Sequence, residues 1–115
     1  MIKRIEAGPR MSQAVIHGNT VYLAGQVAAD PSTDVVDQTR QVLASIDRLL
    51  AAARTDKSRI LMATIYLADI ANFGAMNSVW ESWVAPGVTP ARATVQAHMV
   101  TPAYQVEIVV VAALP

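Results

Sequence analysis

The chain has 115 residues, of which 53% are hydrophobic and 16% are charged, and nine Lys and Arg residues balance nine Asp and Glu residues. This length suits one domain spanning residues 1–115. The zero net charge offers no basic stripe for nucleic acid, and the absence of cysteine excludes disulfides and thiolate chemistry.

The first part of the chain predicts three short strands. Residues 2–6 are expected to form an edge strand, and residues 14–17 and 20–23 are two β-prone runs. Gly18-Asn19 lies between these two runs and is typical of a two-residue hairpin turn.

The clearest element is an amphipathic helix. Apolar residues recur every three or four positions from Val35 to Ala53, which gives one wide apolar stripe. Thr33 or Asp34 can cap the start of this helix through a side-chain oxygen. The helix is expected to end near residues 54–55.

Residues 60–67 predict a strand that is covered on both faces. Strict alternation places Leu61 and Ala63 on one side and Ile60 on the other, and both sides are largely apolar. Helices are expected to cover one side. The composition is too apolar for so small a domain to bury alone, so we expect a neighbouring subunit to cover the other side.

The last part of the chain predicts one helix and two strands. The helix starts at Asn72 and ends before Pro86-Gly87, and the strands span residues 91–96 and 105–113. The resulting order β-β-β-α-β-α-β-β predicts an α+β domain with a mixed sheet and two helices on one face.

Metal and membrane sites have no support in the sequence. His17 and His98 each stand alone, without the spacing of a metal site. The N-terminus lacks an apolar signal core, and the longest apolar stretch, residues 106–115, is interrupted by Glu107 and is too short to span a bilayer. We therefore expect a cytoplasmic protein with no membrane partner.

Five segments form an ordered set that covers nearly the full chain. They are Tyr22-Leu23-Ala24-Gly25-Gln26, residues 63–69 ending in Leu67-Ala68-Asp69, Met76-Asn77-Ser78-Val79-Trp80, Pro90-Ala91-Arg92-Ala93-Thr94-Val95 and residues 106–113. In this order the chain resembles the RidA/YjgF family of reactive-intermediate deaminases. The resemblance implies a chorismate-mutase-like fold and a homotrimer with a central barrel of sheets and clefts between subunits. It also implies hydrolysis of enamines and imines, such as 2-aminoacrylate, to 2-keto acids and ammonia without metal or organic cofactor.

Two charged residues are the candidates for catalysis. Arg92 lies in a strand of small residues, and its planar guanidinium can hold a substrate carboxylate through two parallel hydrogen bonds. Glu107 interrupts a run of Val, Ile and Ala. The resemblance implies that Arg92 binds substrate and that Glu107 positions the attacking water. The structural alternatives are an exposed Arg92 and a salt bridge between Glu107 and Arg92.

Three further residues are candidates for substrate binding. Gly25 allows close approach of the backbone to a ligand, or marks a bend in the strand. Asn77 matches an asparagine of the family motif, and a hydrogen bond from helix to loop is the alternative role. Thr94 stands where many family members have cysteine.

Met11, Ala24 and Thr94 depart from the family pattern, in which tyrosine, serine or threonine, and cysteine are common at these positions. One wall of the cleft is therefore less polar, which leaves two functions open. One is an imine deaminase that uses Arg92 and Glu107, and the other is a non-catalytic trimer that senses 2-keto or amino acids. Ribonuclease activity, often attributed to the family, is disfavoured by the neutral charge, and a chaperone-like oligomer would not depend on Arg92.

Overall fold

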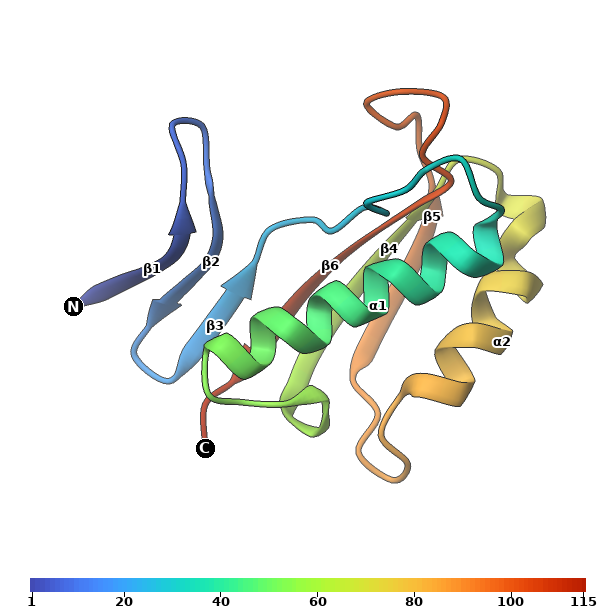
Figure 1. Ribbon diagram of the computed structural model, residues 1–115. Coiled ribbons are helices and arrows are strands. Elements are labelled where there is room, and N and C mark those ends of the chain that lie inside the picture. The colour runs from blue at the N-terminus through green and yellow to red at the C-terminus, as the bar shows by residue number, and fades with distance from the viewer.

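The computed structural model describes all of residues 1–115 and has two layers, a sheet and a pair of helices, in a body 20 Å thick (Figure 1). The strands are β1 (Ile2–Ala7), β2 (Ser12–His17), β3 (Thr20–Leu23), β4 (Ile60–Leu67), β5 (Ala91–Gln96) and β6 (Val106–Ala113). The helices are α1 (Val35–Ala52) and α2 (Phe73–Trp83), with short 3-10 helices η1 (Lys57–Arg59) and η2 (Ile70–Asn72). The predicted α+β order of strands and helices is confirmed.

The six strands form one mixed sheet in the order β1-β2-β3-β6-β4-β5. The β4–β5 pair is parallel, because α2 carries the chain back across the sheet between these two strands, and the other neighbours are antiparallel. Both helices lie on the same face of the sheet, as predicted (Figure 1). Strand β5 is left at one edge of the sheet.

The hydrophobic core lies between this face and the helices. Alternate residues of each central strand point into it, and the apolar stripe of α1 covers them. Asp34 caps α1, because its carboxylate accepts a hydrogen bond of 2.9 Å from the N–H of Asp37. The largest fully buried side chains include Leu43, Ile46, Leu49, Leu50, Ile65, Leu67, Met76 and Ile108.

One prediction for β4 is wrong at its first residues. Ile60 is 5% exposed and lies in the core with Ala63, whereas Leu61 is 52% exposed. The pairing with β6 shifts register between Ile60 and Met62, so an irregularity of the bulge type interrupts the alternation. Strict alternation therefore holds only from Met62 onward.

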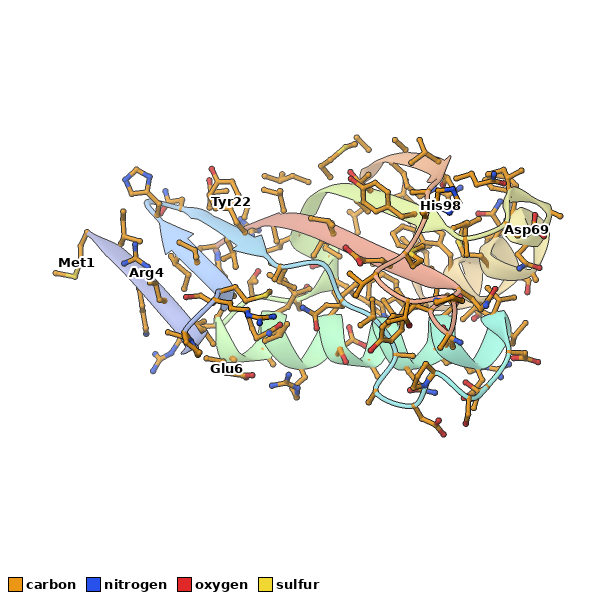
Figure 2. The ribbon with its side chains drawn as sticks, turned by 90° about the horizontal axis from the view of Figure 1, so that it is seen from above. Met1, Arg4, Glu6, Tyr22, Asp69 and His98 are labelled. Atoms are coloured by element: carbon orange, nitrogen blue, oxygen red, sulfur yellow. The ribbon has the colours of Figure 1, made fainter.

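The other face of the sheet has no helix over it. Its side chains include Tyr22, which is 49% exposed, and Val95, which is 44% exposed, and Tyr22 projects away from α1 (Figure 2). Tyr66, Val109 and Val111 belong to the same face by the strand register and are half-buried. We call this surface the open face. No helix combines the length and apolar composition needed to cross a membrane.

Candidate functional site

The strand register separates the two candidate catalytic residues. Arg92 pairs with Ala63, whose side chain lies in the core. Glu107 pairs with Tyr66 on the open face. Since Ala63 and Tyr66 are an odd number of residues apart in the regular part of β4, they point to opposite faces, and so do Arg92 and Glu107. The suggested salt bridge between Arg92 and Glu107 is therefore wrong within one chain, where the ion pair present is Arg48–Glu6.

Arg92 lies against two aromatic rings of α2. Its Cζ is 5.7 Å from the ring centroid of Phe73 and 5.4 Å from that of Trp80. The guanidinium is half-buried and has no carboxylate partner. Two ring faces stabilise the cation and restrict its motion while leaving its N–H donors for an anion. Such a guanidinium is suited to binding a carboxylate.

Asn77 and Thr94 add two unpaired polar atoms between α2 and β5. Asn77 Oδ1 and Thr94 Oγ1 are buried without a hydrogen-bond partner. Asn77 lies between Phe73 and Trp80 along α2, and Thr94 follows Arg92 on the same face of β5. The alternative hydrogen bond from helix to loop does not form at Asn77 Oδ1. Because buried polar atoms are normally paired, these atoms mark a place where a hydrogen-bonding partner is needed.

We call this set the arginine half-site: Phe73, Asn77, Trp80, Arg92 and Thr94. It contains three of the residues proposed from the sequence. The sequence analysis did not propose Phe73 and Trp80 as site residues. Their spacing of seven residues along one helix is the signal that places them together.

Gly25 and Glu107 meet on the other side of the sheet. A Cβ atom at position 25 would overlap the Glu107 carboxylate, coming within 2.9 Å of its Cδ. A larger residue at position 25 would therefore displace the Glu107 side chain. The sequence anticipated a close approach of Gly25 to a ligand, and here its neighbour is the candidate catalytic carboxylate itself.

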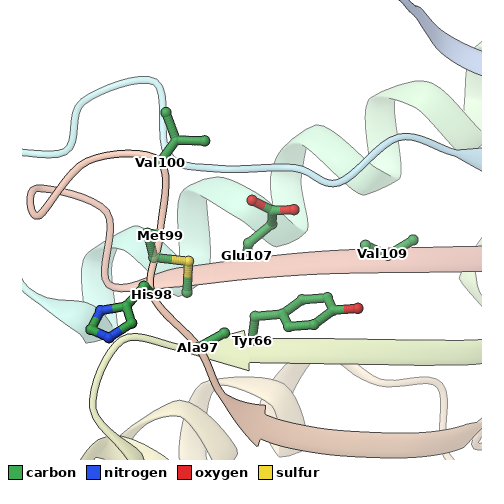
Figure 3. Close-up of a pocket in the computed structure, with 7 residues that line it drawn as sticks. All are labelled: Tyr66, Ala97, His98, Met99, Val100, Glu107 and Val109. Carbon is green, nitrogen blue, oxygen red and sulfur yellow. The ribbon is translucent and has the colours of Figure 1, made fainter.

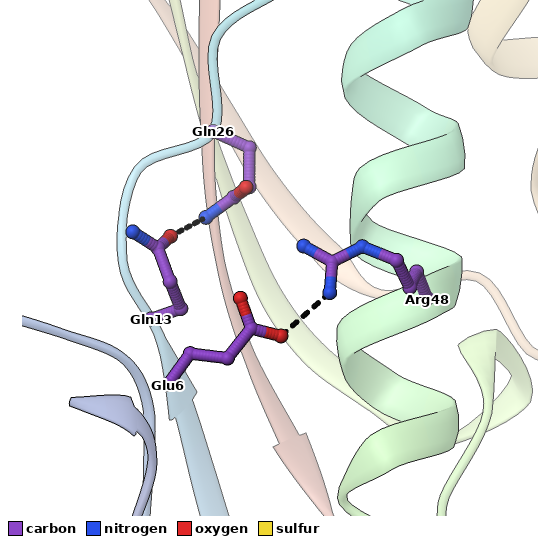
Figure 4. A network of polar contacts seen from close by, with 4 residues as sticks. All are labelled: Glu6, Gln13, Gln26 and Arg48. Atoms are coloured by element: carbon purple, nitrogen blue, oxygen red, sulfur yellow. Dashed lines mark hydrogen bonds and ion pairs between the residues drawn. The ribbon is translucent and has the colours of Figure 1, made fainter. Parts of the chain in front are cut away.

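Gln26 fixes the segment that carries Gly25 (Figure 4). Its backbone N–H donates to the carbonyl of Ile108 at 2.9 Å, and the N–H of Ile108 donates back at 3.1 Å. The buried Gln26 amide donates to Gln13 Oε1 at 3.0 Å and to the carbonyl of Ala24 at 2.9 Å. These bonds hold the strand-like segment beside β6, next to Glu107. The sequence analysis noted Gln26 only as part of a motif.

A cavity of about 300 Å³ opens beside Glu107 (Figure 3). Its lining residues are Tyr66, Ala97, His98, Met99, Val100, Glu107 and Val109. Glu107 is the acidic group on its wall. We call Gly25, Glu107 and this cavity the glutamate half-site. The sequence analysis missed Tyr66 and the loop of residues 97–100, because their proximity to Glu107 depends on pairing between distant strands.

The side chains present do not form a metal site. No group of three or more His, Asp or Glu residues lies close enough together to hold a metal ion. His98 is at the rim of the cavity, with its ring turned away from Glu107 (Figure 3).

Comparison with known proteins identifies one family over the whole chain. Residues 1–114 match the family model described as Endoribonuclease L-PSP. A RutC family protein from Haemophilus ducreyi is 49% identical over 99% of this chain and 97% of its own length. A protein from Capra hircus named 2-iminobutanoate/2-iminopropanoate deaminase is 36% identical over 88% of this chain and 77% of its own length.

The fold gives the same answer. A crystal structure of a YjgF family member from Neisseria meningitidis superposes with a TM-score of 0.97 at 42% identity, covering 100% of this chain and 96% of that one. The chain therefore belongs to the RidA/YjgF family, as its ordered motifs predicted.

Proposed function

We propose that this protein hydrolyses small enamine and imine intermediates of amino acid metabolism, of the 2-aminoacrylate type, to 2-keto acids and ammonia. The observation that carries the proposal is a guanidinium without an ionic partner, held on two aromatic rings. It is a ready receptor for the substrate carboxylate. The name of the Capra hircus relative, at 36% identity, supports the same chemistry. We also place the protein in the cytoplasm.

The proposed active form is a homotrimer. Arg92 and Glu107 are on opposite faces of one sheet, so a second copy must bring them together. Arg92 lies on the edge strand β5, and Glu107 lies on the apolar open face. A contact between the edge of one copy and the open face of the next is heterologous, and such a contact forms a ring when the rotation between copies closes. Three copies would bury the open faces as a central barrel and form three clefts.

In this cleft Arg92 of one copy holds the substrate carboxylate, and Glu107 of the next orients a water molecule toward the imine carbon. The water oxygen bonds to that carbon and one of its protons passes to nitrogen, which gives an amino alcohol. The remaining hydroxyl proton then passes to Glu107 as the C=O double bond of the 2-keto acid forms, the C–N bond breaks, and ammonia leaves. The carbon is already electrophilic when the nitrogen is protonated, so neither a covalent nucleophile nor a cofactor is required. Positioning supplies most of the effect, and the general base adds about a hundredfold or more.

The test is ammonia release from an imine generated in situ by an amino acid oxidase. The Arg92→Lys variant keeps the charge and loses the planar fork, so kcat/KM is expected to fall by about tenfold to a hundredfold. Unchanged turnover in this variant would argue against the carboxylate clamp. Binding of 2-keto acids by the wild-type protein without ammonia release would select the sensor function instead, which the apolar Met11 and Ala24 would then explain.

Ribonuclease activity fits the site less well, although the family model carries that name. Binding of single-stranded RNA needs a groove with several cations along the phosphates. The chain has zero net charge, and Arg92 is the only cation in the two half-sites. We therefore expect no nucleic-acid partner, and RNA binding that weakens steeply with salt would contradict this expectation.

A further inference from the structure

The largest cavity in the structure lies away from both half-sites. Its volume is about 440 Å³, within the range of about 300–1,000 Å³ that is typical of small-molecule sites. Its lining residues are Lys3, Ile16, Ala52, Ala53, Arg54, Leu114 and Pro115. Leu114 follows Glu107 by seven residues along the extended β6, a separation of roughly 20 Å. Arg92 is on β5, at the opposite edge of the sheet from β1. The proposed deaminase function therefore leaves this cavity unused.

The cavity exists because α1 ends before it reaches the first two strands. The helix stops at Ala52, and no helix lies over β1 and β2 (Figure 1). Ile16 and Leu114 pack against the margin of the hydrophobic core here, and Ala53 is buried in it. An apolar group placed in the cavity would extend the core and gain free energy by leaving water.

Hydrogen bonds hold the walls of the cavity in place. The N–H of Leu114 donates to the carbonyl of Asn19 at 2.9 Å, and the carbonyl of Leu114 accepts from the Arg59 guanidinium at 2.8 Å. The hydroxyl of Thr55 donates to the carbonyl of Ala113 at 2.8 Å. These bonds tie the end of β6 to the turn between β2 and β3 and to the segment after α1. A ligand would therefore meet preformed walls.

Two cations from different elements line the cavity. Lys3 is on β1, and Arg54 directly follows the C-cap of α1. The ion pair of the chain is Arg48–Glu6, so neither of these cations is paired with a carboxylate. Two uncompensated positive charges at an apolar cavity favour a ligand that combines an apolar part with a strongly anionic group.

Arg54 has a backbone conformation that arginine rarely adopts. Its φ of 64° is in the left-handed region. The N–H of Arg54 donates to the carbonyl of Ala51 and that of Thr55 to the carbonyl of Leu50, which is the pattern of a Schellman motif. Glycine is preferred at this position, so the arginine is held against backbone strain. Two roles could offset the strain: binding of an anion, or contact of a cation with the negative end of the helix dipole.

We propose that this cavity binds a soluble phosphate monoester with an apolar tail of about eight carbons. Such a group carries a charge of about −1.5 to −2 at pH 7 and accepts hydrogen bonds from both Lys3 and Arg54. The tail lies against Ile16 and Leu114. An octyl phosphate has about thirteen heavy atoms, which matches the space of roughly fifteen water molecules in the cavity. A phosphate headgroup in a bilayer has similar charge, but its tail is already buried among lipids.

The test is calorimetric titration with octyl phosphate below its critical micelle concentration. Lys3→Gln is expected to weaken binding by about threefold to tenfold, because it removes one charge-assisted contact. Arg4→Gln is the matched control, since it removes the same charge from the next residue, on the opposite face of β1, and should leave binding unchanged. Butyl phosphate should bind at least about tenfold more weakly than octyl phosphate, because four methylenes no longer contact the apolar walls.

The Arg54→Gly variant separates anion binding from helix capping. Under the proposal it weakens binding of octyl phosphate by about threefold to tenfold. The melting temperature should stay equal or rise, because glycine adopts the left-handed conformation without strain. A lower melting temperature with unchanged affinity would mean that Arg54 serves the helix dipole, which overturns the assignment.

Binding that persists in Arg92→Ala and weakens in Lys3→Gln would support the proposal. No measurable binding of octyl phosphate would overturn it directly. Loss of binding in Arg92→Ala, or competition by pyruvate, would place the ligand at the arginine half-site instead. Equal affinity for inorganic phosphate and octyl phosphate would leave no role for the apolar walls. Binding to vesicles that contain phosphatidic acid, without binding of octyl phosphate, would identify a bilayer surface as the partner, and each of these results overturns the proposal.

Discussion

The two half-sites are built in different ways. In the arginine half-site, side chains of α2 hold the functional group: two rings flank the guanidinium, and two buried polar atoms nearby lack partners. In the glutamate half-site the backbone positions the functional group, because Gly25 lies against Glu107 and backbone hydrogen bonds of Gln26 hold that segment beside β6. Under the proposed function, binding of the substrate carboxylate would depend on side-chain packing, and the position of Glu107 would depend on the fit of the backbone. The arginine half-site contains no carboxylate, and the glutamate half-site contains no Lys or Arg.

The largest expected change in kcat/KM comes from variants that each keep only one of the two half-sites intact. Arg92→Ala and Glu107→Gln should each lose about a hundredfold or more in kcat/KM, since one removes the clamp and the other the base. When the two variants are unfolded together and refolded at equal amounts, some clefts receive an intact Arg92 from one chain and an intact Glu107 from the other. Random assembly of a closed ring gives about a quarter of the wild-type activity.

Each variant refolded alone is the control and should stay inactive. A mixture that remains as inactive as its components would show that both residues must come from the same chain. That outcome would contradict the proposal that one cleft combines Arg92 of one subunit with Glu107 of the next.

The second-largest change is expected in kcat, when the close fit between Gly25 and Glu107 in the glutamate half-site is disturbed. Gly25→Ala would push the Glu107 carboxylate out of place, since a Cβ atom there overlaps it. We expect kcat to fall by about tenfold to a hundredfold, because small displacements of a reacting group have effects of this size. Binding of a 2-keto acid, measured by calorimetry, should weaken much less, since Arg92 is untouched.

Gly74→Ala is the matched control for this change. Gly74 lies in α2, and nothing lies within 4 Å of a Cβ atom placed there. The alanine should slightly raise the melting temperature through its helix propensity and leave kcat unchanged. Equal losses of kcat in the two variants would argue that Gly25 matters for stability and not for the position of Glu107.

The contrast also explains what the sequence could and could not predict. Local periodicity correctly predicted the order of the elements, and Asp34 is one of the two residues that the sequence offered as the cap of α1. It could not predict that Glu107 is on the opposite face from Arg92. The facing of one strand relative to another is set by register between distant segments, and a shift of one residue reverses it. The irregularity at Ile60 is an example of such a shift within a strand that looked regular.

A smaller effect should follow from removing one ring of the arginine half-site. Phe73→Leu keeps an apolar side chain but removes one of the two ring faces beside Arg92. A cation–π contact at a partly exposed site corresponds to about a twofold to fivefold change in affinity. We expect KM for the imine to rise by this factor with little change in kcat. Lys57→Gln is the control, since it removes the contact of Lys57 with Trp83, and it should not alter KM.

The smallest effect lies outside both half-sites, at Asp30 and Asp56. Hydrogen bonds from the hydroxyl and backbone N–H of Ser32 lower the pKa of Asp30, and those of Ser58 lower the pKa of Asp56 in the same way. A pKa that is lower in the folded state means that the ionised carboxylate stabilises the fold above its ordinary pKa of 3.8. This stabilisation is lost as the pH falls through the lowered value.

The double variant Asp30→Asn/Asp56→Asn keeps an acceptor oxygen at each turn and removes the titration. Its free energy of unfolding, followed by urea denaturation between about pH 2 and pH 4, should fall less steeply with decreasing pH than that of the wild type. The difference should be small, because both carboxylates are fully exposed and solvent screens them. The pH dependence of kcat/KM should be unchanged, since neither residue touches a half-site. A shifted activity profile in this variant would mean that the half-sites respond to charge elsewhere on the chain.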